Sequence, residues 1–169
     1  MKIPGVKPEE EIVKLYLVQH GHAVTEEENP ERPLSEKGRS DVARMAALLG
    51  AWGVRVEKIV HSGKTRARQT AEILAPALGG SDPRKAETAA GLNPGDPVAP
   101  WADRVAEWSE DCMLVGHQPF VGRLAARLVT GRENPDVVRY EPGSAVCVER
   151  SPEGVWAITS MVRPGDLGR

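Results

Sequence analysis

The sequence predicts an α/β fold of three layers, in which helices cover both faces of a mostly parallel central sheet. Short apolar runs of strand length alternate along the chain with longer segments of helical periodicity. Strands that alternate with helices in this way form parallel sheets that are buried on both faces. A chain of 169 residues has the length of one compact domain. We therefore expect a single domain at residues 12–169, preceded by an N-terminal extension at residues 1–11.

Two strands and one helix are predicted within residues 14–60. The apolar run at residues 14–18 is too short for a helix and suits a strand that is buried on both faces. After a polar loop, Ser35 is a suitable N-cap for a helix that ends near residues 50–53. The second strand is expected at residues 56–60. The helix positions expected to face inward are Val42, Met45, Ala46, Leu49 and Trp52.

The next helix is expected to begin after Ser62, a second candidate N-cap, and to end at Gly79 and Gly80. Residues 81–97 are rich in Pro, Gly, Asp and Asn, which indicates an irregular surface segment. A short helix is predicted at residues 98–108. The inward positions of the longer helix are Thr70, Ala71, Ile73, Leu74, Ala77 and Leu78.

The last third of the chain repeats the strand–helix pattern and ends in a hairpin. A strand at residues 112–115 is followed by a helix with one apolar face, which Gly131 is expected to close. The apolar runs at residues 144–148 and 155–159 flank a Ser-Pro-Glu-Gly turn, which predicts two paired strands.

Composition excludes several classes of function. Apolar residues make up 40% of the chain, but no apolar stretch approaches the ~20 residues of a membrane span. The formal charge of −2 gives no basis for binding nucleic acid. Cys112 and Cys147 lie in apolar runs, which predicts buried, reduced thiols and no disulfide. Together with the absence of an apolar signal core in residues 1–11, this predicts a cytoplasmic protein.

All four histidines stand at or near the ends of predicted strands. His20 and His22 follow the first strand, His61 follows the second, and His117 follows the strand at residues 112–115. Parallel sheets bind ligands beyond the carboxyl ends of their strands. The sequence therefore predicts that histidines converge on one edge of the sheet.

Cations next to these histidines indicate an anionic ligand. Lys64, Arg66 and Arg68 fall in the first turns of a predicted helix, where the helix dipole disfavours positive charge. A bound phosphate explains Arg66, because its planar guanidinium suits bidentate contact with phosphate oxygens. A metal site at His20-Gly21-His22 is the competing interpretation, but catalytic zinc needs three protein ligands and nearby cations oppose it. We expect no metal and no cofactor.

Four ordered motifs resemble those of the histidine phosphatase superfamily, which has the phosphoglycerate mutase-like fold. The similarity is greatest to its SixA-type phosphohistidine phosphatase branch. The motifs are Leu17-Val18-Gln19-His20-Gly21-His22-Ala23, Arg32-Pro33-Leu34-Ser35 with Gly38, Ser62 to Thr70, and Val115-Gly116-His117-Gln118-Pro119.

The resemblance implies a two-step phosphoryl transfer without a metal. His20 would attack phosphorus and form a phosphohistidine that water hydrolyses. His117 and Arg66 would complete the catalytic set by binding the equatorial oxygens. The further substrate-binding or phosphate-binding candidates are Gln19, Arg32, His22 and Lys64.

Two departures from the family pattern bear on activity. Gln19 stands in place of the signature arginine, so one positive charge beside the nucleophile is lost. No carboxylate stands at Gln118 or around residues 91–93, where family members carry a general acid. Without a strong acid, a good leaving group is favoured, and the imidazole of phosphohistidine has a conjugate acid of pKa ~6.5.

The leading prediction is therefore a phosphohydrolase that dephosphorylates phosphohistidine on a protein. Two alternatives stay open. One is a phosphatase acting on a small phosphomonoester, and the other is a catalytically weakened phosphate-binding module, because Gln19 lacks the charge of arginine.

Overall fold

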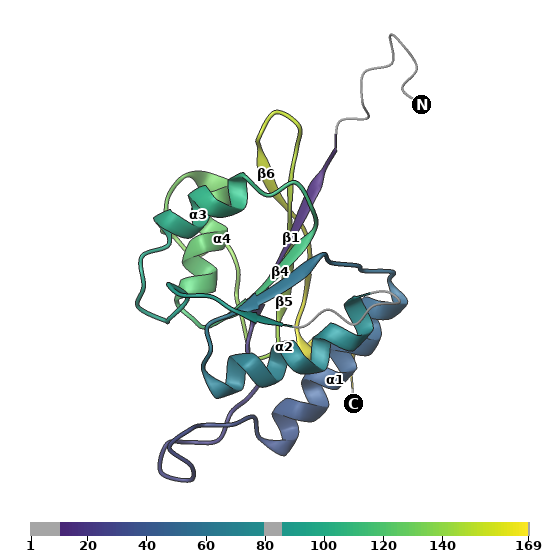
Figure 1. The fold of residues 1–169 in the computed structure, drawn as a ribbon, viewed down its shortest axis with the longest axis vertical. Coiled ribbons are helices and arrows are strands. Elements are labelled where there is room, and N and C mark those ends of the chain that lie inside the picture. Colours follow the sequence, from purple (N-terminus) through teal and green to yellow (C-terminus); the bar gives the residue numbers. More distant parts are fainter. Residues whose placement is uncertain (1–10, 80–85, 169) are drawn as a thin grey trace.

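The computed structural model describes residues 11–79 and 86–168, which form a six-stranded sheet between two pairs of helices (Figure 1). The strands are β1 Val13–Gln19, β2 Lys58–His61, β3 Glu87–Thr88, β4 Cys112–Gly116, β5 Ala145–Arg150 and β6 Trp156–Val162. The helices are α1 Glu36–Ala51, α2 Thr65–Leu78, α3 Ala99–Ala106 and α4 Phe120–Thr130, followed by the short 3-10 helix η1 Pro164–Leu167.

The sheet is mostly parallel, as predicted. Its strand order is β3-β2-β4-β1-β5-β6, and the first four strands run in the same direction. β5 is antiparallel to β1 and to β6, so the predicted hairpin at the end of the chain is present. The carboxyl ends of β2, β4 and β1 consequently lie side by side at one edge of the sheet.

Helices cover both faces of the sheet, which gives the three layers. In Figure 1, α1 and α2 lie on one side of the strands and α3 and α4 on the other. The central strand β1 supplies both cores, because its side chains alternate between faces. Tyr16 and Val18 pack with α1 and α2, whereas Leu15 and Leu17 pack with α3 and α4. The run at residues 14–18 is thus a strand buried on both faces, as predicted.

Two helix termini were predicted from single residues. Ser35 caps α1, since its Oγ accepts a hydrogen bond from the Gly38 amide at 3.0 Å. Gly131 ends α4 with a φ of 78°, a conformation that glycine adopts at little cost.

Three predictions about local structure are wrong. Ser62 is not the N-cap of α2, which begins at Thr65 after Lys64. Trp52 does not face inward but is 56% exposed, because α1 ends at Ala51 and the following turn carries Trp52 past the core. The segment at residues 81–97 is not irregular throughout.

The strand within that segment is β3, which is two residues long. Glu87 and Thr88 pair with Val60 and His61 and so cover the edge of β2. Such a short strand leaves little trace in the sequence, since its position is set by the exposed edge it covers. Residues 1–10 of the predicted N-terminal extension, as well as Gly80 and residues 81–85, lie outside the described residues.

Both cysteines are buried free thiols, as predicted. Cys112 is 2% exposed in β4 and Cys147 is 4% exposed in β5. Among the helices at residues 11–79 and 86–168, none is long and apolar enough to span a bilayer.

The close contact between α1 and the His22 backbone gives a first test of the structure. In Gly38→Ala the new Cβ would lie 2.0 Å from the His22 carbonyl oxygen, so the backbone must shift. We expect the free energy of unfolding to fall by about 1–3 kcal/mol or more, as it does when a packed core is overfilled.

Gly50→Ala in the same helix is the matched control, because its Cβ would approach nothing closer than 3.4 Å. Alanine should raise the free energy of unfolding there by about 0.5–1 kcal/mol. Urea denaturation measures both changes, and equal effects at the two positions would contradict the described packing.

Candidate active site

Parallel strands bring two of the predicted histidines together. Gln19 pairs with Gly116 in the register of β1 and β4, so the next residues, His20 and His117, emerge side by side. The His20 amide donates to the Gly116 carbonyl at 3.0 Å, and the two imidazole centroids are 5.0 Å apart. The predicted convergence therefore holds for this pair.

A hydrogen bond to the backbone fixes the tautomer of His20. Its Nδ1 lies 2.7 Å from the Gly21 carbonyl oxygen. Because a carbonyl oxygen only accepts, Nδ1 carries the proton and Nε2 of the neutral ring keeps a free lone pair. Burial lowers the pKa of His20 to about 4, with the Gly21 carbonyl opposing this and the charges of Arg66 and Arg32 adding to it. At neutral pH His20 is thus an unprotonated nucleophile.

His117 is buried and also uncharged at neutral pH. It is 1% exposed, and burial, followed by the charges of His20 and Arg66, lowers its pKa to about 3. The Oγ of Ser62 lies 2.6 Å from His117 Nε2, whereas His117 Nδ1 has no partner among the described residues. The Ser62 hydroxyl can donate to Nε2, which leaves the proton on Nδ1 and makes His117 a neutral donor.

Arg66 brings a cation to the same place from the first turn of α2. Its Nε is buried without a hydrogen-bond partner among the described residues. Burial and the charge of Arg32 lower the pKa of Arg66, which still remains far above neutral. A buried donor without an acceptor costs about 1–3 kcal/mol. An anion that accepts from Arg66 and offsets both guanidinium charges would recover this cost.

Arg32 is held in an unusual backbone conformation. Its φ of 47° is the one positive φ at a non-glycine residue between 11 and 79 or between 86 and 168. Its Nε donates to the Val24 carbonyl at 3.0 Å, so the side chain folds back across its own loop. Strain of this kind, about 1–3 kcal/mol, persists where the surrounding structure imposes it. The loop thereby holds a cation whose charge acts on both histidine rings.

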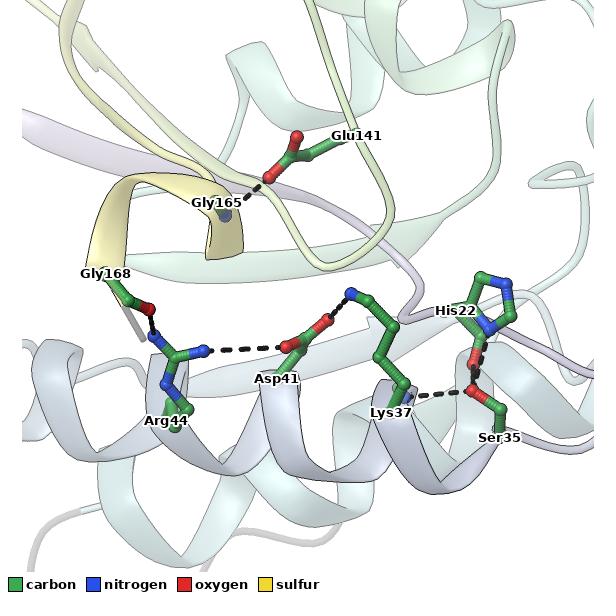
Figure 2. Close-up of polar contacts among 9 residues, drawn as sticks. His22, Ser35, Lys37, Asp41, Arg44, Glu141, Gly165 and Gly168 are labelled. Carbon is green, nitrogen blue, oxygen red and sulfur yellow. Dashed lines mark hydrogen bonds and ion pairs between the residues drawn. The ribbon is translucent and has the colours of Figure 1, made fainter.

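The other predicted site residues lie around this pair. Gln19 extends from the end of β1, and its side-chain Oε1 is buried without a partner in the described part of the chain. Lys64 precedes α2, and its charge contributes to the lowered pKa of His117. His22 is exposed, and its Nδ1 lies 2.7 Å from Ser35 Oγ at the start of α1 (Figure 2). His61 is buried, and its Nδ1 accepts from the Gly63 amide at 3.1 Å.

Two residues of α2 to which sequence reasoning assigned no role in the site hold its loops. Thr70 is fully buried, and its Oγ1 accepts from the Gly21 amide at 3.0 Å and donates to the Arg66 carbonyl at 2.7 Å. The Gln69 Oε1 accepts from the Leu34 amide at 2.8 Å. The contact of Ser62 with His117 was not predicted either, because a serine before a helix indicates an N-cap. Helical periodicity indicates only that Thr70 faces inward, so the presence of Ser62, Gln69 and Thr70 in the second arginine motif is the one signal that could have indicated their roles.

The turn at residues 141–144 supports His20 from the other side. The Gly143 amide donates to the carbonyls of Gln19 and His20 at 3.1 and 3.0 Å. The Gln19 amide donates to the Ser144 carbonyl at 3.1 Å. The end of β1 is therefore tied to a turn more than 120 residues later in the chain.

The C-terminal 3-10 helix braces that turn against α1 (Figure 2). The Glu141 carboxylate accepts from the Gly165 amide at 2.7 Å, and the Gly168 carbonyl accepts from Arg44 at 2.6 Å. Arg44 lies 3.7 Å from Asp41, which also pairs with Lys37 at 2.5 Å. Lys37 is thus engaged along α1 rather than directed at the histidine pair.

The charges that act on the two rings are cationic or come from the other histidines. No carboxylate of the described residues, which would raise the pKa, is among the groups that act on either ring. Within residues 11–79 and 86–168, no group of three His, Cys, Asp or Glu side chains is arranged to hold a metal ion. The arrangement combines an unprotonated nucleophile with neutral and cationic donors, which suits attack on a phosphoryl group.

Comparisons with known proteins agree with this arrangement. The model of the histidine phosphatase superfamily (branch 1) matches residues 15–111. An uncharacterized protein of Picosynechococcus sp. is 35% identical over 127 residues, which cover 71% of this chain and 75% of the relative. Phosphohistidine phosphatase SixA of Escherichia coli (strain K12) is 28% identical over 149 residues, which cover 85% of this chain and 91% of the relative.

The fold is also shared with solved structures. The structure of the protein histidine phosphatase SixA complexed with tungstate aligns with a TM-score of 0.81 at 23% identity. The alignment covers 92% of this chain and 99% of that one. The predicted three-layer, phosphoglycerate mutase-like fold is therefore confirmed.

The protonation states of His20 and His117 can be read directly by NMR of the ring nitrogens. We expect His20 to be the Nδ1–H tautomer and both rings to stay neutral from pH 8 to about 5.5, since their pKa values are about 4 and about 3. The exposed His22 serves as the internal comparison in the same spectra. Protonation of His20 near the ordinary pKa of ~6.5 would contradict the described burial.

Proposed function

This chain belongs to the histidine phosphatase superfamily (branch 1), and on that premise we propose that it is a phosphohydrolase with His20 as the nucleophile. The observation that carries the proposal is the hydrogen bond from His20 Nδ1 to the Gly21 carbonyl, which leaves Nε2 free beside Arg66 and His117. An anion-binding set with an unprotonated nucleophile at its centre supports transfer as well as binding.

The first step forms a bond between His20 Nε2 and phosphorus while the bond to the leaving group breaks on the opposite side. The leaving group departs with the bonding electron pair and takes up a proton from solvent water. In the second step, water attacks the phosphohistidine and releases a proton to solvent, and His20 leaves with its electron pair restored. Arg66 and His117 would donate to the equatorial oxygens, where negative charge accumulates.

Gln19 shapes the charge of the proposed pocket. The amide adds no charge where the signature arginine would add one, and a lost donor of this kind costs ~10²–10³ in rate. Arg32 and Lys64 contribute positive charge at the rings and would compensate in part. We assign Gln19, Arg32 and Lys64 to the phosphate, and His22 to the border of the pocket with Ser35.

The proposed substrate is phosphohistidine on a protein. Because Gln118 and residues 91–93 carry no carboxylate where members of the family place a general acid, a leaving group that departs without a strong acid is favoured. Imidazole meets this requirement better than a sugar alcohol. The E. coli relative named phosphohistidine phosphatase SixA supports the same substrate. Two buried free thiols are consistent with the proposed cytoplasmic location.

A weakened phosphate-binding module is the second candidate, and Gln19 is the observation that favours it. Such a module would retain Arg66 and the histidines but would not turn over substrate. A phosphatase of small phosphomonoesters is the enzymatic alternative. The following experiments distinguish all three.

Incubation with a phosphoramidate and rapid quenching should trap an acid-labile phosphoryl group on His20. His20→Ala should lose the label and lower turnover by at least about 10³-fold, because the covalent route is removed. His61→Ala, which alters a histidine outside the facing pair, is the matched control for the loss of an imidazole. Binding of phosphate without labelling or turnover would establish the module. A sugar phosphate preferred over a phosphohistidine peptide would establish the small-substrate phosphatase.

Gln19→Arg should raise kcat/KM for the phosphoramidate by ~10-fold or more, because a charged donor replaces a neutral one. Gln19→Lys is the comparison variant, since it restores the charge without the planar fork. Steady-state kinetics of the three proteins measure the effect. An unchanged kcat/KM in both variants would show that the neighbouring cations already supply this interaction.

A further inference from the structure

A groove of about 370 Å³ is lined by residues that lie next to those of the proposed pocket in the chain. It is lined by Gln118 and by residues 136–140, which connect α4 to the turn before β5. Neither the catalytic steps nor the resemblance to the family uses this segment.

The residues at both ends of the groove are close in sequence to residues that form or support the pocket. Gln118 follows His117, so one wall begins at the buried imidazole. At the other end, Tyr140 is followed by the turn whose Gly143 amide donates to the carbonyls of Gln19 and His20. The segments that line the groove are therefore continuous with those that position His117 and His20.

The backbone of this segment is fixed in place but is not paired. Val138 is 7% exposed, and the Tyr140 hydroxyl donates to the Leu17 carbonyl at 3.0 Å, so the segment is anchored to the core. The N–H and C=O groups of residues 136–140 make no hydrogen bond with any residue of the described ranges. Asp136 and Arg139, which are exposed, also lack ion-pair partners there.

Gln118 adds a side-chain donor to the same groove. Its Oε1 accepts from the Gly122 amide at 2.9 Å, which fixes the orientation of the amide plane. The amide nitrogen then remains as a donor for another group. The groove thus presents an anchored row of main-chain donors and acceptors and one oriented amide.

We propose that residues 136–140 and Gln118 bind the main chain of a protein segment that carries the phosphohistidine. The proposal rests on the function proposed above. Free main-chain groups on an anchored segment bind an extended peptide by pairing with its backbone, and side chains then set preference. The two unpaired charges, on Asp136 and Arg139, would meet side chains of opposite charge in the bound segment. A small phosphate ester offers no main chain for this pairing.

N-methylation of a substrate peptide tests the proposal without altering the enzyme. A phosphohistidine peptide should have a higher kcat/KM than a small phosphoramidate. N-methyl groups on the residues flanking the phosphohistidine should lower kcat/KM about tenfold per hydrogen bond lost, mainly through KM. The same methyl groups at the far end of the peptide are the control. Equal turnover of the parent and the flank-methylated peptide would overturn main-chain pairing.

A binding experiment separates this proposal from the proposed function. His20→Ala is mixed with a peptide that carries a non-hydrolysable phosphonate in place of the phosphoryl group. Amide hydrogen exchange at residues 136–140 should slow by about tenfold or more, whereas exchange at the Gly154 turn should not change. Unchanged exchange at residues 136–140 would overturn the groove proposal. Slowed exchange together with an enzyme that hydrolyses no phosphoramidate would retain the groove and reject the phosphohydrolase.

Discussion

The parallel pairing of β1 with β4 sets the geometry on which the rest of the site depends. Its register places Gln19 opposite Gly116, so that the next residue of each strand is a histidine and the two rings come within 5.0 Å. A one-residue slip would move the side chains of β1 to the opposite face of the sheet. The two cores prevent this, because Leu15 and Leu17 fill one of them while Tyr16 and Val18 fill the other.

The pocket holds positive charge without a neighbouring carboxylate among the described residues, which suits the proposed binding of a phosphoryl group. Arg66 is partly buried with its Nε fully enclosed, Arg32 is held at a positive φ, and no carboxylate of the described chain is among the groups that shift the pKa of His20 or His117. Buried charge without a counterion is costly, and the protein tolerates this cost where a ligand is to supply the counterion. Burial is the main reason that His20 is unprotonated at neutral pH, and the cations that would bind the anion lower its pKa further.

Support for the nucleophile comes from parts of the chain that are far apart in sequence. Thr70 of α2 holds the Gly21 amide, and the turn at residues 141–144 holds the carbonyls of Gln19 and His20. That turn is connected through Glu141 to the C-terminal 3-10 helix, which Arg44 joins to α1. The groove along residues 136–140 leads into the same turn. A peptide bound there would therefore contact the structure that positions His20.

The sequence by itself determined the α/β class, the order of the main strands and helices, and the histidines and cations that gather at one edge of the sheet. These features are encoded locally, by apolar periodicity, by caps such as Ser35 and Gly131, and by residues at strand ends. Tertiary structure decided the rest: the tautomer of His20, the contact of Ser62 with His117, the exposure of Trp52 and the pairing of β3. Each of these depends on which groups meet across distant segments and on how deeply they are buried, which local periodicity does not specify.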